Sequence, residues 1–390
     1  MLPNDPIVAI TPEVIGWRHV IHANPELGFQ ETATARFVAE RLRAFGLEVH
    51  EGIGGTGVVG VLRRGAGTRS IGLRAELDAL PITERTGKPH ASRNAGVMHA
   101  CGHDGHTAAL LGAAKLLSEQ ADFDGTVHFV FQPAEENIGG GIRMIEDGLF
   151  QRFPMDAVYA VHNWPGLGLG KIACHVGPMM AAVDNFELRF TGTGAHAAMP
   201  HLGDDPIVAA GAFINSVQRI VSRAVDPQTP LVVSLTQVHG GNVGNVVPGE
   251  VWLQGTCRFF DASLSDLCER QLGQIAAGIA SAHGVSAQVE YQRGYPPVIN
   301  TAEPVANAVA AARSAVGTAD VVTDFAASLG CEDFATMVRA AGGAYAWIGA
   351  GDAGPGEGLH GDRYDFNDAI VPVVLNYWVN LVRQVLGPAT

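Results

Sequence analysis

The chain has 390 residues, of which 47% are hydrophobic and 16% charged, and its formal net charge is −14. This composition excludes a disordered chain, and the acidic balance argues against a nucleic-acid partner, because phosphate contacts need clustered Lys and Arg. The length predicts two or three domains.

The N-terminal stretch MLPNDPIVAITPEVIGWRHV has no basic region followed by a continuous apolar run, so we expect no signal peptide. No apolar run approaches the roughly 18–20 residues of a membrane span, so we expect no membrane partner. The five cysteines are scattered and odd in number, which is typical of free thiols in a reducing compartment. The sequence therefore predicts a cytoplasmic globular protein.

The first part of the chain alternates helices and strands. Thr11-Pro12 predicts the start of a helix that runs to about Ala23, and a second helix stops at Gly46. Further helices are expected near 106–117 and 141–146. Short apolar runs predict strands at 57–62, 71–77, 126–131 and 157–162. This alternation indicates a mostly parallel α/β sheet covered on both faces.

The order of elements changes near Met179. From there to Arg293 the pattern is β-α-β-β-α-β, which is typical of a two-layer ferredoxin-like α+β domain. Alternation returns with an apolar strand at 344–351 and a closing helix at about 370–386. We therefore expect an α/β domain of residues 1–178 and 294–390, with residues 179–293 inserted as a smaller domain.

The stretch MHACGHDGHTA crowds Cys101, His103, Asp104 and His106 against the start of a helix. A thiol and an imidazole two residues apart at a turn can both reach one metal ion. The alternative is a buried cysteine beside a surface histidine, so further ligands have to decide.

Such ligands follow three predicted strands. Asp78 follows the strand at 71–77, Glu135 and Glu136 follow the strand at 126–131, and His162 ends the strand at 157–162. Open α/β sheets bind ligands at the carboxyl ends of their strands, so these side chains are expected to converge. In the adjacent glutamate pair, one residue can bind metal while the other faces a metal-bound water as general base. The alternative is an exposed acidic turn.

Other candidates are weaker. His360 lies in the glycine-rich stretch GLHGDRYDFND, which is equally compatible with a surface turn. His196 and His201 lie between a strand and a helix, where a structural role is common. Asn245 is expected near the tip of a hairpin. Cys331-Glu332-Asp333 is also compatible with simple helix capping.

Seven segments in this order carry a family resemblance: HANPELGFQET (22–32), LRAELDALPI (73–82), MHACGHDGHTA (98–108), FQPAEE (131–136), GAHAAMPH (194–201), CEDFA (331–335) and LHGDRYDFND (359–368). Together they resemble the amidohydrolase branch of the aminoacylase and carboxypeptidase G2-like metallopeptidases. That branch includes hippurate hydrolases, N-acyl-amino-acid deacylases and auxin-conjugate hydrolases. The match runs nearly end to end.

The resemblance implies a binuclear metal site with a Glu135 general base and with Asp78 orienting a ligand. The implied ligands are Cys101, His103, Glu136, His162 and His360. It also implies that the inserted domain is a lid and dimerisation surface, and that His196 stabilises an oxyanion. The implied reaction is hydrolysis of small N-acyl amino acids by a homodimer or higher homo-oligomer.

Several points stay open at this stage. Zinc, manganese, cobalt and nickel all suit such a donor set. Asn245 and Arg258 are substrate-binding candidates, although Arg258 is equally compatible with a solvated surface position. Two residues depart from the family pattern: Asp362 replaces a usual Pro, and Cys331 replaces a common Ser. A dipeptidase and a non-catalytic binding protein are the alternative functions.

Overall fold

The computed structural model describes residues 5–120, 122–136 and 139–388. The chain divides into two compact units. The first consists of Met1–Met179, Val298–Ala326 and Asp333–Thr390, and the second of Met180–Pro297 and Ala327–Glu332.

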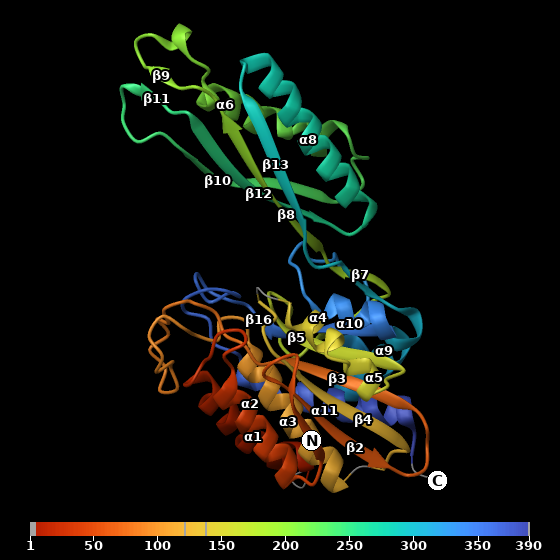
Figure 1. Ribbon diagram of the computed structural model, residues 1–390. Coiled ribbons are helices and arrows are strands. Elements are labelled where there is room, and N and C mark those ends of the chain that lie inside the picture. The colour runs from red at the N-terminus through yellow and green to blue at the C-terminus, as the bar shows by residue number, and fades with distance from the viewer. Residues whose placement is uncertain (1–4, 121, 137–138, 389–390) are drawn as a thin grey trace. The chain divides into compact units, whose positions relative to one another are not determined.

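An eight-stranded sheet organises the first unit, in the order β1-β2-β4-β3-β5-β16-β6-β15 (Figure 1). Its centre is a run of parallel strands: β4 (Gly125–Gln132), β3 (Ser70–Glu76), β5 (Ala157–Pro165) and β16 (Gly343–Gly351). At one edge, β2 (Gly57–Arg64) and β1 (Glu48–Ile53) are added by antiparallel pairing. At the other edge, β6 (Ile172–Ala173) pairs antiparallel with β16, and β15 (Val321–Val322) pairs parallel with β6. The predicted mostly parallel α/β fold is confirmed.

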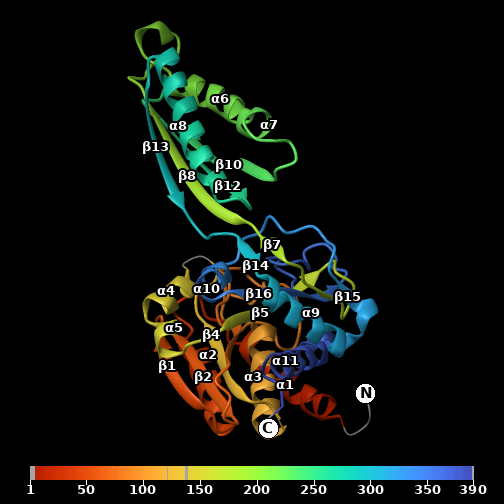
Figure 2. The same cartoon turned by 90° about the vertical axis from the view of Figure 1, so that its right-hand side faces the viewer.

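Helices cover both faces of this sheet, so the central strands are buried on both sides (Figure 2). One face carries α1 (Pro6–His22), α2 (Thr32–Ala44), α3 (His103–Gln120), α9 (Ala302–Val316) and α11 (Val371–Leu386). The other carries α4 (Gly140–Glu146), α5 (Leu149–Arg152) and α10 (Phe334–Ala341). Every residue of β4 is buried, as expected for a central strand that is covered on both faces.

The first helix begins earlier than predicted. Asp5 is its N-cap, with the carboxylate accepting the Ile7 N–H at 2.9 Å, and Pro6 is the first helical residue. Pro12, which was expected to open the helix, lies inside it. The Thr11 hydroxyl donates to the Ile7 carbonyl at 2.6 Å instead of capping. Both Asp5-Pro6 and Thr11-Pro12 could start a helix, and the first of these pairs sets the N-terminal end of α1.

One helical stretch, Asp368–Leu386, is long and apolar enough to cross a membrane by length and composition, although the sequence reading expected no such run. In the structure 61% of its apolar window is buried, and α11 packs against α1, α3 and α9. We interpret it as a core helix of the first unit.

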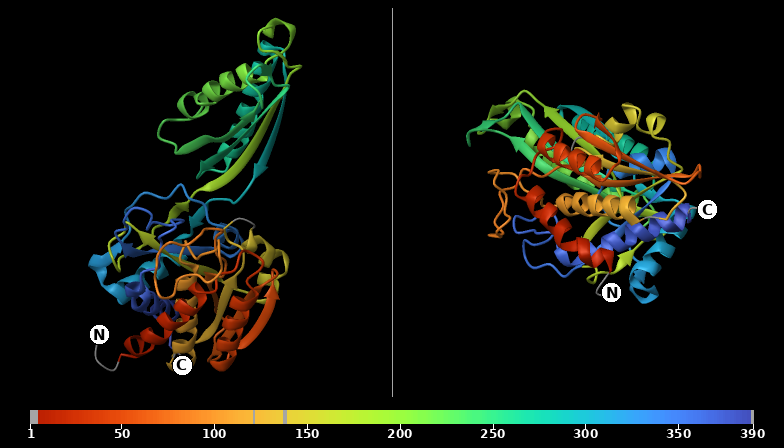
Figure 3. Two further views of the ribbon diagram at one scale, coloured as in Figure 1. Left: turned by 90° about the vertical axis from the view of Figure 1, so that its left-hand side faces the viewer. Right: turned by 90° about the horizontal axis from the view of Figure 1, so that it is seen from below.

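The second unit is a four-stranded antiparallel sheet with its helices packed on one face (Figure 3). In chain order its elements are β8 (Ala182–Thr191), α6 (Pro206–Val217), α7 (Arg219–Arg223), β10 (Leu231–Gly240), β12 (Glu250–Phe259), α8 (Ser263–His283) and β13 (Ser286–Arg293). The spatial order β10-β12-β8-β13 places the first and third strands side by side at the centre, as in a ferredoxin-like sheet.

Short elements complete the described chain. They are the strand pairs β7 (Gly177–Met180) with β14 (Val298–Asn300) and β9 (Ala195–His196) with β11 (Val246–Val247), and the single turns η1 (Pro200–Leu202), η2 (Thr318–Asp320) and η3 (Asp368–Ile370).

Candidate metal centre

Six candidate side chains of the first unit converge at the carboxyl edge of its sheet. The Cys101 sulfur lies 3.4 Å from His162 Nε2, and His360 Nε2 lies 3.3 Å from Glu136 Oε1. His103 Nε2 is 4.0 Å from one oxygen of each glutamate of the adjacent pair. Three overlapping sets each have ligand atoms within 4.8 Å of one another: Cys101/His103/His162, Cys101/Glu136/His360 and His103/Glu135/Glu136.

The donor atoms of this cluster fit a cation. His103 Nε2 is buried and makes no hydrogen bond to any residue that the structure describes. Leaving such an atom unsatisfied costs roughly 1–3 kcal/mol, and a bound divalent ion would remove that cost. Burial and the neighbouring charges of Glu136 and Glu135 raise the pKa of the Cys101 thiol well above its usual value. A metal ion reverses that preference, because a coordinating thiol is deprotonated.

Both buried histidines of the cluster are oriented by their second nitrogen. His103 Nδ1 lies 2.9 Å from the Asp78 carbonyl and 3.3 Å from Asp78 Oδ1, and His162 Nδ1 lies 2.7 Å from the Asn163 carbonyl. Because these are acceptors, each Nδ1 donates and each Nε2 is directed to the cluster. Burial opposes the charge on His103, but the hydrogen bond and charge of Asp78 outweigh it and raise the pKa of His103 to about 10.

The loops that bring these side chains in are held in uncommon backbone conformations. His360 has φ 63° and Ala134, just before the glutamate pair, has φ 49°. The His360 N–H donates to the Ala100 carbonyl at 2.7 Å, and the Ala134 N–H donates to the Glu31 carboxylate at 2.8 Å. Positive φ at non-glycine residues is often found at functional sites, where the surrounding structure fixes it.

A buried polar network, which sequence reasoning missed, lies beneath the cluster. His106 Nδ1 is 2.8 Å from Glu76 Oε2, and its Nε2 is 2.7 Å from Asn163 Oδ1. The Asn163 amide donates to the Tyr364 hydroxyl at 2.7 Å, and Arg74 pairs with Glu76. Burial opposes the charge of Glu76, but Arg74 and His106 hold its pKa well below the usual value. The sequence signal for this network was the presence of two charged residues, Arg74 and Glu76, in the otherwise apolar strand β3.

A second buried network is centred on Arg18 of α1, which is fully buried. Its guanidinium pairs with Asp104 at 3.2 Å, Asp365 at 2.9 Å and Asp368 at 2.6 Å. The acidic residues that flank His103 and His360 in sequence therefore bind an arginine. They tie α1 to the start of α3 and to the loop that carries His360.

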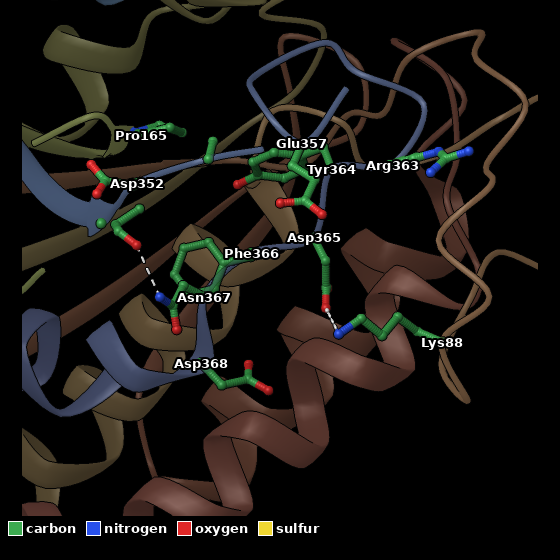
Figure 4. A pocket seen from close by; sticks show the side chains of 13 residues that line it. Lys88, Pro165, Asp352, Glu357, Arg363, Tyr364, Asp365, Phe366, Asn367 and Asp368 are labelled. Carbon is green, nitrogen blue, oxygen red and sulfur yellow. Dashed lines mark hydrogen bonds and ion pairs between the residues drawn. The ribbon is translucent and has the colours of Figure 1, made fainter. Parts of the chain in front are cut away.

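A cavity of about 410 Å³ lies beside this loop, near the ends of β5 and β16 (Figure 4). Its lining includes Lys88, Asp365 and Asp368. Asp365 is engaged by Arg18 and by Lys88 at 3.7 Å, and Asp368 is engaged by Arg18 and His19. These carboxylates are therefore already paired within the protein.

The two departures from the family pattern lie at separate places. The Asp362 carbonyl accepts the Arg85 N–H at 2.7 Å, and its carboxylate lies 3.4 Å from the Arg85 guanidinium. The aspartate thus adds an acidic contact to Arg85 that a proline could not make. Cys331 is half-buried and belongs to the second unit.

The second unit brings His196 and Asn245 together. His196 of β9 pairs in register with Val246 of β11, and the Ala197 N–H donates to the Asn245 carbonyl at 3.0 Å. As predicted, Asn245 lies at the tip of a hairpin, in the connection between the antiparallel strands β10 and β12, and the residues that follow it also pair with β9. His196 Nδ1 accepts the Ala198 N–H at 3.1 Å, so the ring proton is on Nε2.

Arg258 lies elsewhere in this unit. It pairs in register with Val232 and Val183 near the end of β12, whereas β11 adjoins the start of that strand. Glu250 and Arg258 are eight steps apart along β12, or roughly 27 Å at ~3.4 Å per residue. Within this unit the structure therefore separates Arg258 from His196 and Asn245.

The fold and the site define a metal-dependent hydrolase. Thiol, imidazole and carboxylate groups that can bind metal lie at the carboxyl edge of an α/β sheet, and a second carboxylate, that of Glu135, lies beside them. The model of peptidase family M20/M25/M40 matches residues 72–384. The chain belongs to this family and is a metal-dependent amidohydrolase, as the sequence motifs indicated.

Relatives and solved structures agree with this assignment. A hippurate hydrolase of Campylobacter jejuni is 40% identical over 369 residues, which cover 95% of each chain. An N-acyl-L-amino acid amidohydrolase of Geobacillus stearothermophilus is 45% identical over 294 residues, or 75% of this chain and 79% of that one. The crystal structure of the Bacillus subtilis YXEP protein, described as a dinuclear metal-binding peptidase, matches with a TM-score of 0.83 and 32% identity, covering 98% of this chain and 99% of that one.

Proposed function

We propose that this enzyme hydrolyses the amide bond of small N-acyl amino acids, with two divalent metal ions at the cluster of the first unit. The five proposed ligands are Cys101, His103, Glu136, His162 and His360. The observation that carries the proposal is a sixth donor, the Glu135 carboxylate, which lies beside this set with Oε2 4.0 Å from His103 Nε2. Two bound ions would polarise the scissile carbonyl and acidify a water molecule. Zinc, manganese, cobalt and nickel are the candidate metals.

Glu135 is the general base in this proposal. Its side chain is buried, with Oε2 4.0 Å from His103 Nε2 and Oε1 3.4 Å from the Asp333 N–H. In this position it can take the proton of the attacking water and return it to the departing nitrogen. An amide nitrogen leaves poorly as an anion, so the returned proton is needed for the bond to break. General acid–base catalysis of this kind contributes about 10²–10⁴-fold.

The geometry also supports different roles for the two adjacent glutamates, with Glu136 as a metal ligand and Glu135 as the base. The Glu136 carboxylate is close to His360 and belongs to a set with Cys101. The backbone N–H of Glu136 donates to Asp78 Oδ2 at 3.0 Å, so Asp78, which orients His103, also holds Glu136 in place. A storage or structural site, in contrast, is closed by its ligands and has no use for a spare carboxylate. This distinction favours an enzyme over a binding protein.

The two glutamates provide a matched pair of variants. Glu135→Gln keeps size and hydrogen bonding but cannot accept a proton, so kcat should fall by about 10²–10⁴-fold while metal content and KM change little. Glu136→Gln should instead reduce metal content. Steady-state kinetics and metal analysis of both variants test this assignment. If Glu135→Gln loses metal, the roles of the pair are reversed, and if it keeps full activity, the proposed base is wrong.

We also propose that the second unit acts as a lid and that the enzyme is a cytoplasmic homodimer or higher homo-oligomer formed through it. His196 would stabilise the oxyanion, with Asn245 beside it. Arg258 is a separate candidate for a substrate carboxylate. Hydrolysis of N-acetyl, N-benzoyl and indole-acetyl amino acids, compared with plain dipeptides, distinguishes this function from a dipeptidase, because only a dipeptidase pocket accepts a free amine.

A further inference from the structure

The segment HANPELGFQET (22–32) contributes none of the proposed metal ligands, yet it contains a fully buried glutamate, Glu31. No Lys, Arg or His among the residues that the structure describes forms an ion pair with it. Burial raises the pKa of Glu31, and hydrogen bonds from Thr56 and Ala134 only partly oppose this effect. Acidic side chains are seldom fully buried without a cation, because burial removes water from the charge. The hydrogen-bond partners of Glu31 indicate why the carboxylate is there.

The helix that follows Glu31 does not use its side chain. Glu31 is the N-cap residue of α2, but its carboxylate makes no capping hydrogen bond. The Glu26 carboxylate instead accepts the N–H groups of Ala33 at 3.0 Å and Thr34 at 2.8 Å. The two glutamates of this segment therefore have separate roles, because Glu26 caps α2 and Glu31 is left to bind other parts of the chain.

The two carboxylate oxygens of Glu31 join segments that are distant in sequence. Oε1 accepts the Ala134 N–H at 2.8 Å, and Oε2 accepts the Thr56 hydroxyl at 2.6 Å. Thr56 lies in the turn between β1 and β2, and Ala134 lies between β4 and the adjacent glutamate pair. An added Cβ at Gly57 would lie only 3.1 Å from Pro133 Cδ, so the same turn packs closely on this loop. Glu31 thus ties the loop after β4 to the β1–β2 turn.

The backbone conformation of Ala134 makes this tie important. Its φ of 49° lies in the left-handed region, which is unfavourable for alanine because the Cβ approaches a carbonyl oxygen. Ala134 is also buried, so its N–H cannot turn to water if Glu31 is lost. The hydrogen bond from Glu31 therefore offsets the backbone strain and satisfies a buried donor at the same position.

The residues on either side of Glu135 have different anchors. The Glu136 N–H is held by Asp78 Oδ2, whereas the Ala134 N–H is held by Glu31. The dihedral angles of Ala134 set the direction in which the chain enters Glu135. A change at Ala134 should therefore move the base more than the ligand Glu136, which keeps its contact with Asp78.

We propose that Glu31 is a positioning residue, which orients the Glu135 carboxylate by holding Ala134 in the left-handed conformation. This inference rests on the proposed function and deepens it, since it adds what fixes the base in place. Glu31 acts through the backbone and does not touch the substrate. Small displacements of a catalytic group lower the rate strongly, so the loss of this hydrogen bond should reduce catalysis at a distance.

Kinetics and metal analysis of metal-loaded variants test this role, with N-benzoylglycine as substrate. Glu31→Ala should lower kcat about 10–100-fold, as the loss of a supporting residue typically does, while KM and metal content change little. Glu31→Gln should keep most of the activity, because its amide oxygen can accept the Ala134 N–H and its amide nitrogen can donate to the Thr56 hydroxyl. Glu26→Ala, the matched control, removes the α2 cap and should leave kcat unchanged.

Two further variants separate positioning from a general structural role. Glycine adopts positive φ without strain, so adding Ala134→Gly to Glu31→Ala should raise kcat severalfold. A double variant no more active than Glu31→Ala would overturn the proposal. Glu31→Asp keeps the charge but withdraws the carboxylate by one methylene, so it should also lower kcat. It replaces Glu31→Ala in both comparisons if that variant does not fold.

Hydrogen exchange of the metal-free protein measures the same contact without catalysis. Amides of residues 131–136 should exchange faster in Glu31→Ala than in wild type and Glu31→Gln, while those of β3 are unchanged. Equal rates in wild type and Glu31→Ala, or equal acceleration in both segments, would overturn the proposal. If Glu135→Gln keeps full activity, the proposed base fails, and hydrogen exchange alone decides whether Glu31 holds the loop.

Discussion

Cys101 is the residue at which the metal centre departs most from an ordinary hydrolase site of imidazoles and carboxylates. Its thiol is buried among carboxylates that raise its pKa, so the thiolate needs a nearby cation. His103, with its pKa raised to about 10, likewise holds a proton that metal would displace. Metal binding should therefore release protons, and metal affinity should increase with pH.

Replacing Cys101 with Ser tests the role of the thiolate. A hydroxyl is deprotonated much less readily than a thiol, and thiolates favour zinc over manganese. Zinc affinity should fall by more than the roughly 10–100-fold that loss of a supporting residue costs, and manganese affinity should fall less. Competition with a chelator of known affinity measures both values. Equal losses for the two metals would argue that Cys101 is not a ligand.

At the scale of single elements, β4 carries a titratable group in the core. His128 is buried, and mainly because of this burial its pKa is lowered to about 4. The unfolded chain, with an ordinary histidine pKa of about 6.5, binds the proton first as pH falls. The stability associated with neutral His128 is therefore complete above pH ~6.5 and is lost as the pH falls toward about 4.

His128→Leu should remove this part of the acid sensitivity. From the two pKa values, the wild-type free energy of unfolding should fall by about 2 kcal/mol more than that of the variant between pH 7 and pH 5. Urea unfolding of metal-free protein at both pH values gives the comparison. The same decrease in wild type and variant would show that His128 is not the responsible group.

The elements also show what the sequence could predict. Apolar runs predicted the central strands because those strands are buried on both faces. The ends of the predicted strands then located the loops that carry the site residues. Arg18 and Arg74 were not foreseen, because burial of a charged residue depends on partners far away in sequence. Arg18 pairs with Asp365, and Arg74 donates to Asp333 at 2.8 Å. The two-residue strands β9 and β11 carry no periodic pattern to detect.

For the whole molecule, the proposed dimer can be tested by mixing inactive chains. If His196 acts on the active site of a partner subunit, a dimer of one His196→Ala chain and one Glu135→Gln chain has one site with both residues intact. Random mixing should then restore about a quarter of wild-type activity, because half of the dimers are mixed and each has one working site of two. No recovery in verified mixed dimers would mean that His196 acts within its own chain or not at all.

The central claim is that the cluster around Cys101 and Glu136 binds two metal ions in each chain. The most direct measurement is a titration of metal-free protein with zinc or manganese, followed by metal analysis after free ions have been removed. The account predicts two ions per chain in the wild type and fewer in Glu136→Gln. Saturation at one ion per chain, or none, in active wild-type enzyme would contradict it.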